Sequence, residues 1–171
     1  MTLSFRRQAD VRSTSFAVAA EEHLDDVYGY LVYLTRDRSL AEDLTADTFE
    51  KALKLWSRFD ARRASARTWL CQIARTTALD WFRAEERRRR REERTALPER
   101  VDEAFLEGLS AELEAALATL SAAEREVIAL RVLLELDGEE TGRVLGISPT
   151  NVSTRLSRAL AKLEERVAVH V

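Results

Sequence analysis

The segment that decides the fold is LDGEETGRVLGISPTNVSTRLSRAL, residues 136–160. Asp137, followed three residues later by Glu140, forms a capping box and predicts that a short helix begins there. Gly146 predicts a tight turn at the end of that helix, because glycine accepts a positive φ angle without strain. The Ser-Pro pair at 148–149 predicts a second helix, with serine as its N-cap and proline at its first position.

The two helices are close enough in sequence to form a helix-turn-helix. Gly142 is small and allows the helices to approach, and Ile147 is expected to fill the space between them. In this motif the second helix lies in the major groove of DNA, with its N-terminal residues facing the base edges. That helix is polar and cationic, with no acidic residue between Ser148 and Lys162. The residues predicted to contact duplex DNA are Thr150, Asn151, Ser153, Thr154, Arg155, Ser157 and Arg158.

The rest of the chain also predicts helices. The 171 residues include only 5 glycines and 2 prolines, which argues against a sheet-rich fold. Capping boxes at Ser39/Glu42 and Ser121/Glu124 predict two further helix starts, the first near Leu40. We therefore expect an all-α protein of two small helical domains joined by a flexible acidic linker.

Apolar residues at three- and four-residue steps predict which helix faces are buried. In the first domain these residues are Leu24, Val27, Tyr28, Leu31 and Leu34, then Leu44, Phe49, Leu53 and Trp56, then Leu70, Ile73, Ala74, Thr77 and Trp81. In the second they are Leu109, Leu113, Leu117 and Leu120, then Val152, Leu156, Ala159, Leu160, Leu163 and Val167. The pattern divides the chain into an N-terminal extension (1–20), a first domain (21–91), a linker (92–108) and a second domain (109–171).

Charge is distributed unevenly along the chain. The net charge is −3, but residues 61–95 carry a net charge of +6 and residues 96–140 a net charge of −9. Phosphate binding requires local positive charge rather than a basic protein. The basic block also contains Trp69, Trp81 and Phe82, and arginines interleaved with aromatic rings suit single-stranded nucleic acid. The alternative is that the charges solubilise helices and the aromatic rings belong to the core.

Several classes of function are disfavoured. The single cysteine, Cys71, cannot form an internal disulfide or a cysteine-based zinc site. The two histidines, His23 and His170, lie at opposite ends of the chain, and there is no glycine-rich phosphate loop. We therefore expect no catalytic site, no metal and no cofactor. No apolar run approaches the roughly 18–20 residues that a membrane span needs, so we expect a cytoplasmic protein without membrane insertion.

The order and spacing of several short stretches resemble the extracytoplasmic-function (ECF) sigma factors, which keep only sigma regions 2 and 4. The resemblance covers about residues 22–166. The matching stretches include residues 47–49 (DTF), 67–70 (RTWL), 73–75 (IAR) and 145–148 (LGIS).

The resemblance implies a factor that binds core RNA polymerase and directs promoter-specific initiation by recognising the −35 and −10 elements and stabilising DNA melting. It implies the β′ clamp helices and the β flap as polymerase partners, promoter DNA as the other partner, and an anti-sigma factor as regulator. The implied core polymerase-binding residues are Asp43, Leu44, Asp47, Phe49 and Glu50. The implied −10 DNA-binding residues are Arg62, Arg63, Ser65, Arg67, Trp69, Arg75, Thr76 and Arg83.

The chain departs from the family pattern at a few of these positions. Thr76 replaces a usual asparagine, Thr141 replaces an aliphatic residue, and Ser153 and Ser157 replace lysine and histidine. We therefore expect this chain to prefer −10 and −35 promoter sequences that differ from those usual in the family.

Two other classes of function remain open. One is a helix-turn-helix repressor or activator that acts without being a polymerase subunit. Such a protein normally needs a dimerisation surface, and the sequence shows no clear heptad or spare apolar stripe. The other is a helical adaptor with no role on nucleic acid, which would have no use for an acid-free recognition helix.

Overall fold

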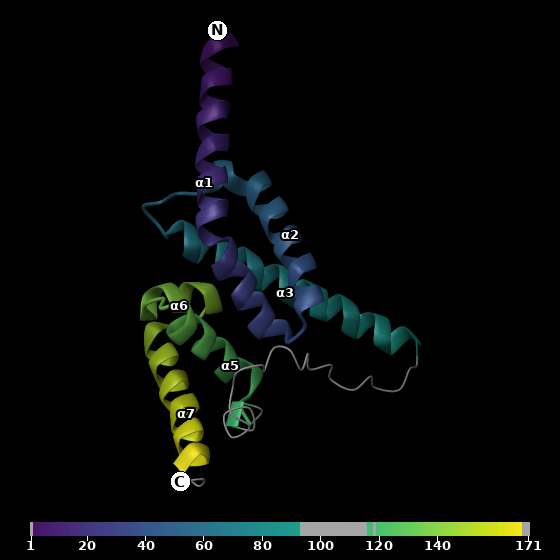
Figure 1. Cartoon of the computed structure of the whole chain (residues 1–171), viewed down its shortest axis with the longest axis vertical. Helices are drawn as coiled ribbons and strands as arrows, with labels where there is room; N and C mark the ends of the chain where they lie inside the picture. Colours follow the sequence, from purple (N-terminus) through teal and green to yellow (C-terminus); the bar gives the residue numbers. More distant parts are fainter. Residues whose placement is uncertain (1, 93–115, 118, 169–171) are drawn as a thin grey trace.

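The computed structural model describes residues 2–92, 116–117 and 119–168, and these residues form helices and their connections (Figure 1). The elements are α1 (Thr2–Thr35), α2 (Arg38–Leu55), a 3₁₀ turn η1 (Trp56–Arg58), α3 (Ala66–Glu92), α5 (Ala122–Ile128), a π-helical turn η3 (Ala129–Leu133), α6 (Gly138–Leu145) and α7 (Pro149–Ala168). The predicted all-α fold is confirmed. The predicted linker beyond Glu92, and the stripe residues Leu109 and Leu113, lie outside the described residues.

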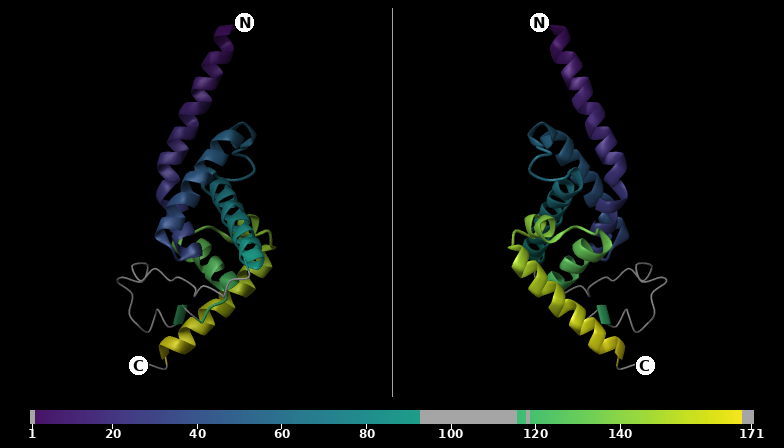
Figure 2. Two further views of the ribbon diagram at one scale, coloured as in Figure 1. Left: turned by 90° about the vertical axis from the view of Figure 1, so that its right-hand side faces the viewer. Right: turned by 90° about the vertical axis from the view of Figure 1, so that its left-hand side faces the viewer.

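Helices α1, α2 and α3 pack into a first bundle. Its core contains Val27, Leu31, Leu44 and Leu70, all at most 1% exposed. Helix α1 already begins at Thr2, so residues of the predicted N-terminal extension are continuous with the first helix, which projects from the bundle (Figures 1 and 2).

Helix α2 begins earlier than the capping-box pattern predicted. Asp37, in extended backbone, is the N-cap, and its side chain accepts a hydrogen bond from the N–H of Leu40 at 3.0 Å. The prediction of Ser39 as the cap was wrong, because the carboxylate two residues earlier satisfies the free N–H groups first.

A few residues predicted to be buried are exposed instead. Leu24 is 47% exposed, Leu53 52%, Trp81 37% and Leu160 39%. On α2 the buried positions include Thr45 and Thr48, whose hydroxyls donate to backbone carbonyls one turn earlier. A threonine can therefore occupy a core position that an apolar stripe does not reveal, because its hydroxyl is satisfied within its own helix.

The second helical group follows the sequence pattern closely. Both of its predicted capping boxes form, Ser121 with Glu124 ahead of α5 and Asp137 with Glu140 ahead of α6. Val152 and Ala159 bury one side of α7 against α5 and α6.

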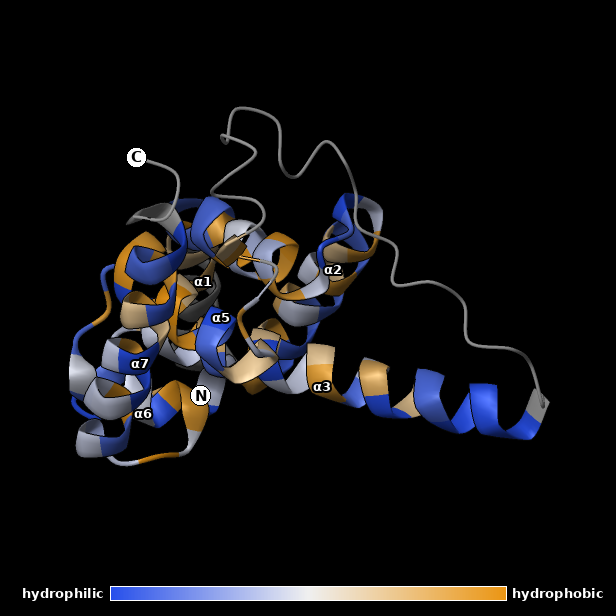
Figure 3. Cartoon of the chain, turned by 90° about the horizontal axis from the view of Figure 1, so that it is seen from below, coloured by the Kyte–Doolittle hydropathy of each residue, from blue (hydrophilic) through white to orange (hydrophobic). Residues whose placement is uncertain are grey.

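The two groups pack against each other. Helix α6 contacts α3, and α5 and η3 contact α1. Val127, Leu130 and Leu136 belong to the same buried cluster as Tyr30 and Leu70. The arginine-rich end of α3 extends away from this shared core as a strongly hydrophilic helix (Figure 3). None of the helices in the described ranges is long and apolar enough to cross a membrane.

Candidate nucleic-acid and polymerase interface

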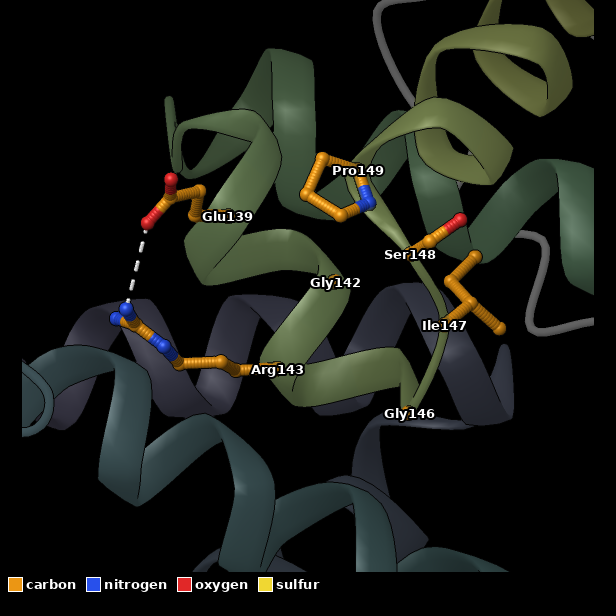
Figure 4. A pocket seen from close by; sticks show the side chains of 7 residues that line it. All are labelled: Glu139, Gly142, Arg143, Gly146, Ile147, Ser148 and Pro149. Atoms are coloured by element: carbon orange, nitrogen blue, oxygen red, sulfur yellow. Dashed lines mark hydrogen bonds and ion pairs between the residues drawn. The ribbon is translucent and has the colours of Figure 1, made fainter.

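The helix-turn-helix consists of α6, the turn at Gly146 and α7. Gly146 has a φ of 69°, in the left-handed region that favours glycine, and this confirms the predicted turn. A Cβ added to Gly142 would lie 2.6 Å from the carbonyl oxygen of Ile147, so close helix approach requires glycine there. Figure 4 shows both glycines beside the turn. They line an open hollow of about 440 Å³ that also contains the ion pair between Glu139 and Arg143.

The recognition helix α7 starts as predicted. Pro149 is its first residue, and the hydroxyl of Ser148 accepts a hydrogen bond from the N–H of Asn151 at 3.2 Å. Within the described ranges, no carboxylate pairs with the guanidinium group of Arg155 or Arg158. Of the predicted −35 residues, Thr150, Asn151, Ser153, Thr154, Ser157 and Arg158 are exposed and Arg155 is half-buried.

An aromatic cluster supports the loop that precedes α3. Trp56 stacks on Phe59 with ring centroids 4.7 Å apart, and Trp69 meets Trp56 edge-on at 5.7 Å. Phe16 of α1 also meets Trp56 edge-on, at 5.3 Å. Trp69, predicted to contact DNA, is half-buried in this cluster and so supports the loop as well.

The loop itself places two arginines at the surface. Arg62 and Arg63 are exposed, and the side chain of Arg62 forms two 3.0 Å hydrogen bonds to Asp60. These bonds lower the pKa of the Asp60 carboxyl. The loop is therefore held by a local ion pair and by the aromatic cluster beneath it.

The remaining predicted −10 residues differ in how accessible they are. Thr76 and Arg83 are exposed on α3, and Arg83 pairs with Asp80 of the same helix at 3.3 Å. Arg67 lies 3.7 Å from Asp26 of α1.

Two members of the predicted set, exposed Ser65 and half-buried Arg75, contact the second helical group. Arg75 pairs with Glu126 of α5, and Ser65 lies beside Glu140 of α6. Neither glutamate was predicted from the sequence as a partner for these residues. Glu126 did carry a signal, since it lies one helical turn from buried Leu130, where a charge needs a partner.

The predicted polymerase-binding residues form an acidic surface on α2. Asp43, Asp47 and Glu50 are exposed, and Lys54 donates a hydrogen bond to Glu50 that lowers the pKa of its carboxyl. Phe49 is half-buried. Leu44 is 1% exposed and packs in the core, so it holds the helix in place and offers no surface to a partner.

Comparison with known proteins agrees with this arrangement. Residues 19–88 match the family described as Sigma-70 region 2, and residues 110–163 match Sigma-70, region 4. The ECF RNA polymerase sigma factor SigC of Mycobacterium tuberculosis is 36% identical over 138 residues, which cover 78% of this chain and 73% of SigC. SigX of Bacillus subtilis is 28% identical over 165 residues, covering 90% of this chain and 84% of SigX.

Solved structures show the same fold. The sigma factor RpoE of Bartonella quintana, in complex with the anti-sigma factor NepR, superposes with a TM-score of 0.77 at 24% identity, covering 91% of this chain and 98% of RpoE. CnrH, in complex with the cytosolic domain of CnrY, gives a TM-score of 0.71 at 24% identity, covering 95% of this chain and 96% of CnrH. Two sigma family matches in the expected order, with relatives along most of the chain, identify the protein: it belongs to the ECF RNA polymerase sigma factors, the subunits that direct transcription initiation.

Proposed function

We propose that three separate surfaces of this sigma factor divide its work in initiation. The acidic surface of α2, with Asp43, Asp47 and Glu50, binds the β′ clamp helices of core polymerase. The loop and α3 surface, residues 62–83, captures the melted −10 strand. The N-terminal part of α7, residues 150–158, binds the −35 duplex, with the β flap as the polymerase partner of region 4.

The observation that carries this proposal is the surface of α7. Its first turns are exposed, and no acidic residue interrupts them. Arg155 and Arg158 are close to hydroxyl groups of Thr154 and Ser157 along the same helix, so charge and hydrogen-bonding groups occur together. This combination can contact both phosphates and purine acceptors in the major groove.

The proposed division follows domain bounds of 21–91 for region 2, 92–108 for the linker and 109–171 for region 4, after an extension at 1–20. Binding energy of the single-strand contacts offsets base unpairing, so the factor needs no ATP and has no catalytic activity of its own. It acts in the cytoplasm, where core polymerase and promoter DNA are found. By analogy with RpoE, which was solved in complex with the anti-sigma factor NepR, an anti-sigma factor is its regulator.

Run-off transcription tests the proposal. In a first step, core polymerase bound to the purified chain is used to identify the genomic fragments that it transcribes. In a second step, a promoter from one of these fragments serves as the template for run-off transcription. We expect transcripts that depend on both the factor and the promoter. If the chain bound duplex DNA tightly by itself but never conferred initiation, the chain would act as a helix-turn-helix repressor or activator instead.

The Arg155→Ala, Arg158→Ala double variant tests the −35 surface. Losing two guanidinium contacts should weaken binding to −35 duplex by about 2 kcal/mol and reduce the dependence of affinity on salt. Arg143→Ala, an exposed arginine outside the proposed surface, is the control. Unchanged binding in the double variant would place the DNA contacts on another face.

A further inference from the structure

The polar face of α3, which we define as Thr68, Gln72 and Arg75 together with Ser65 just before the helix, contacts the second helical group. These residues follow one another at steps of three, four and three, so they share one side of the helix. Each makes a hydrogen bond to α5 or α6. Two of them, Ser65 and Arg75, belong to the proposed −10 surface.

Glu126 of α5 makes the charge-paired contact of this set. Its Oε1 accepts hydrogen bonds from the Arg75 Nε and from the Tyr30 hydroxyl of α1, both at 2.8 Å. The Glu126 side chain is only 9% exposed, so the pair is largely shielded from water. Burial and the nearby carboxylate raise the pKa of Tyr30 well above its ordinary value, which keeps the tyrosine a donor.

Glu140 of α6 makes the second contact. Its Oε1 accepts from the Thr68 hydroxyl at 2.9 Å and lies 3.2 Å from the Ser65 hydroxyl. Its other oxygen accepts the N–H of Asp137 in the capping box, so the carboxylate is fixed by its own helix. Gln72 adds a hydrogen bond from its side-chain amide to the carbonyl oxygen of Arg143, at 3.0 Å.

The chemistry of these contacts matches that of a nucleic-acid ligand. Guanidinium and hydroxyl donors on α3 are the groups that a phosphate oxygen would accept from, and carboxylate oxygens now take that place. Because Arg75 directs its Nε and one terminal nitrogen to Glu126, a DNA strand can use those donors only after the glutamate leaves.

We propose that the polar face of α3 has a second partner, region 4 of the same chain, whose Glu126 and Glu140 occupy it in competition with the −10 strand. This rests on the proposed assignment of α3 to −10 binding. The acidic surface of α2 and the first turns of α7 stay exposed in this closed arrangement. Polymerase and −35 DNA can therefore be contacted first, and the −10 strand binds after the two groups separate.

Charge-neutral substitutions test the competition. The Glu126→Gln, Glu140→Gln variant keeps side-chain shape, and glutamine still completes a capping box. The control is Glu139→Gln, since Glu139 is exposed on the same helix and contacts Arg143 rather than region 2. We measure binding of the free chain to a fluorescent degenerate DNA single strand by anisotropy.

We expect about tenfold tighter binding in the double variant, because apparent affinity rises with the fraction of open molecules. Unchanged affinity, or an equal gain in Glu139→Gln, would overturn the proposal.

A reversible cross-link tests whether separation is required. Gln72→Cys and Arg143→Cys, in a Cys71→Ala background, are joined by a short bis-methanethiosulfonate reagent that dithiothreitol cleaves. The joined factor should still bind core polymerase but give at least tenfold less run-off transcript, recovered after cleavage. Full transcription by the joined factor would refute the proposal that the two helical groups must separate before initiation. Absence of promoter-dependent transcript from the unjoined, unmodified chain would instead refute the proposed function.

Discussion

Helices α3 and α7 carry similar chemistry but differ in what surrounds them. On α7, Arg155 and Arg158 have no carboxylate partner within the described residues, and the hydroxyl of Thr154 donates only to its own helix, at 3.0 Å from the carbonyl oxygen of Thr150. On α3, Arg75 and Thr68 donate to glutamates of the other helical group. The residue composition of the two helices therefore does not decide which of them has its side-chain donors occupied. The positions of Glu126 and Glu140 decide this.

The largest effect is expected at the aromatic cluster that supports the loop before α3. Phe16 is 9% exposed and meets Trp56 edge-on, so Phe16→Ala leaves a cavity beside the aromatic cluster. We expect a loss of about 3 kcal/mol in the free energy of unfolding, measured by urea denaturation. Promoter-dependent run-off should fall, while the affinity for −35 duplex should not change.

Val18→Ala is the matched control for this prediction, because Val18 is on the same helix but 57% exposed. If Val18→Ala and Phe16→Ala behaved alike, the loop would not depend on α1.

The helix-turn-helix is expected to be next in sensitivity. Gly142→Ala places a Cβ 2.6 Å from the carbonyl oxygen of Ile147, and the backbone must shift. We expect a loss of about 2 kcal/mol in stability and weaker −35 binding. Gly138→Ala meets only the Cβ of Pro149, at 3.9 Å, and should be tolerated. Equal stability of the two variants would show that close approach of α6 and α7 is not needed.

A pH-dependent effect is expected at the junction of α5 and α7. Hydrogen bonds from Lys162 and from the Ser121 backbone lower the pKa of Glu124 to about 2. A lowered pKa stabilises the fold above the ordinary pKa of 4.5, and this stabilisation is lost as the pH falls toward 2. Glu124→Gln should therefore lower the free energy of unfolding by on the order of 1–2 kcal/mol at neutral pH. The effect is limited to this size because Lys162 is half-exposed and its charge is partly screened by solvent.

Thermal unfolding measures the difference in melting temperature between Glu124→Gln and the unmodified chain. This difference should disappear as the pH is lowered from 4.5 to 2. A difference that stayed constant over this range would mean that the ion pair does not stabilise the fold.

The smallest effect is expected at a buried threonine of region 4. Thr141 is 0% exposed, and its hydroxyl has no hydrogen-bond partner among the residues that the structure describes. Thr141→Val removes this unsatisfied group at nearly constant volume and should raise stability by about 1 kcal/mol. Thr48→Val in region 2 is the control, because the Thr48 hydroxyl donates to the carbonyl oxygen of Leu44. A gain in Thr48→Val equal to that in Thr141→Val would contradict this reasoning.

Local signals in the sequence predicted region 4 well. Gly146, Pro149 and the Asp137–Glu140 capping box each act within a few residues, so their geometry follows from neighbouring sequence alone. The start of α2 was less predictable, because Asp37 and Ser39 both suit an N-cap and the pattern does not rank them.

The contacts between the two helical groups could not be predicted in this way. Arg75 and Glu126 are 51 residues apart, and Tyr30 and Glu126 are 96 apart. A helical stripe reports which side of a helix is buried but not which helix buries it. The proposed −10 residues were named from the family resemblance, whereas the glutamates that contact Ser65 and Arg75 could be identified only in the folded chain.

The single cysteine, Cys71, gives this molecule a native reporter of how tightly α3 is packed. Cys71 is 0% exposed on α3 and adjoins Gln72 of the polar face. Burial raises the pKa of its thiol to about 12, so in the closed arrangement it is protected from thiol reagents. The rate at which Cys71 reacts with a disulfide reagent therefore reports how often the packing around this part of α3 opens, without any engineered label.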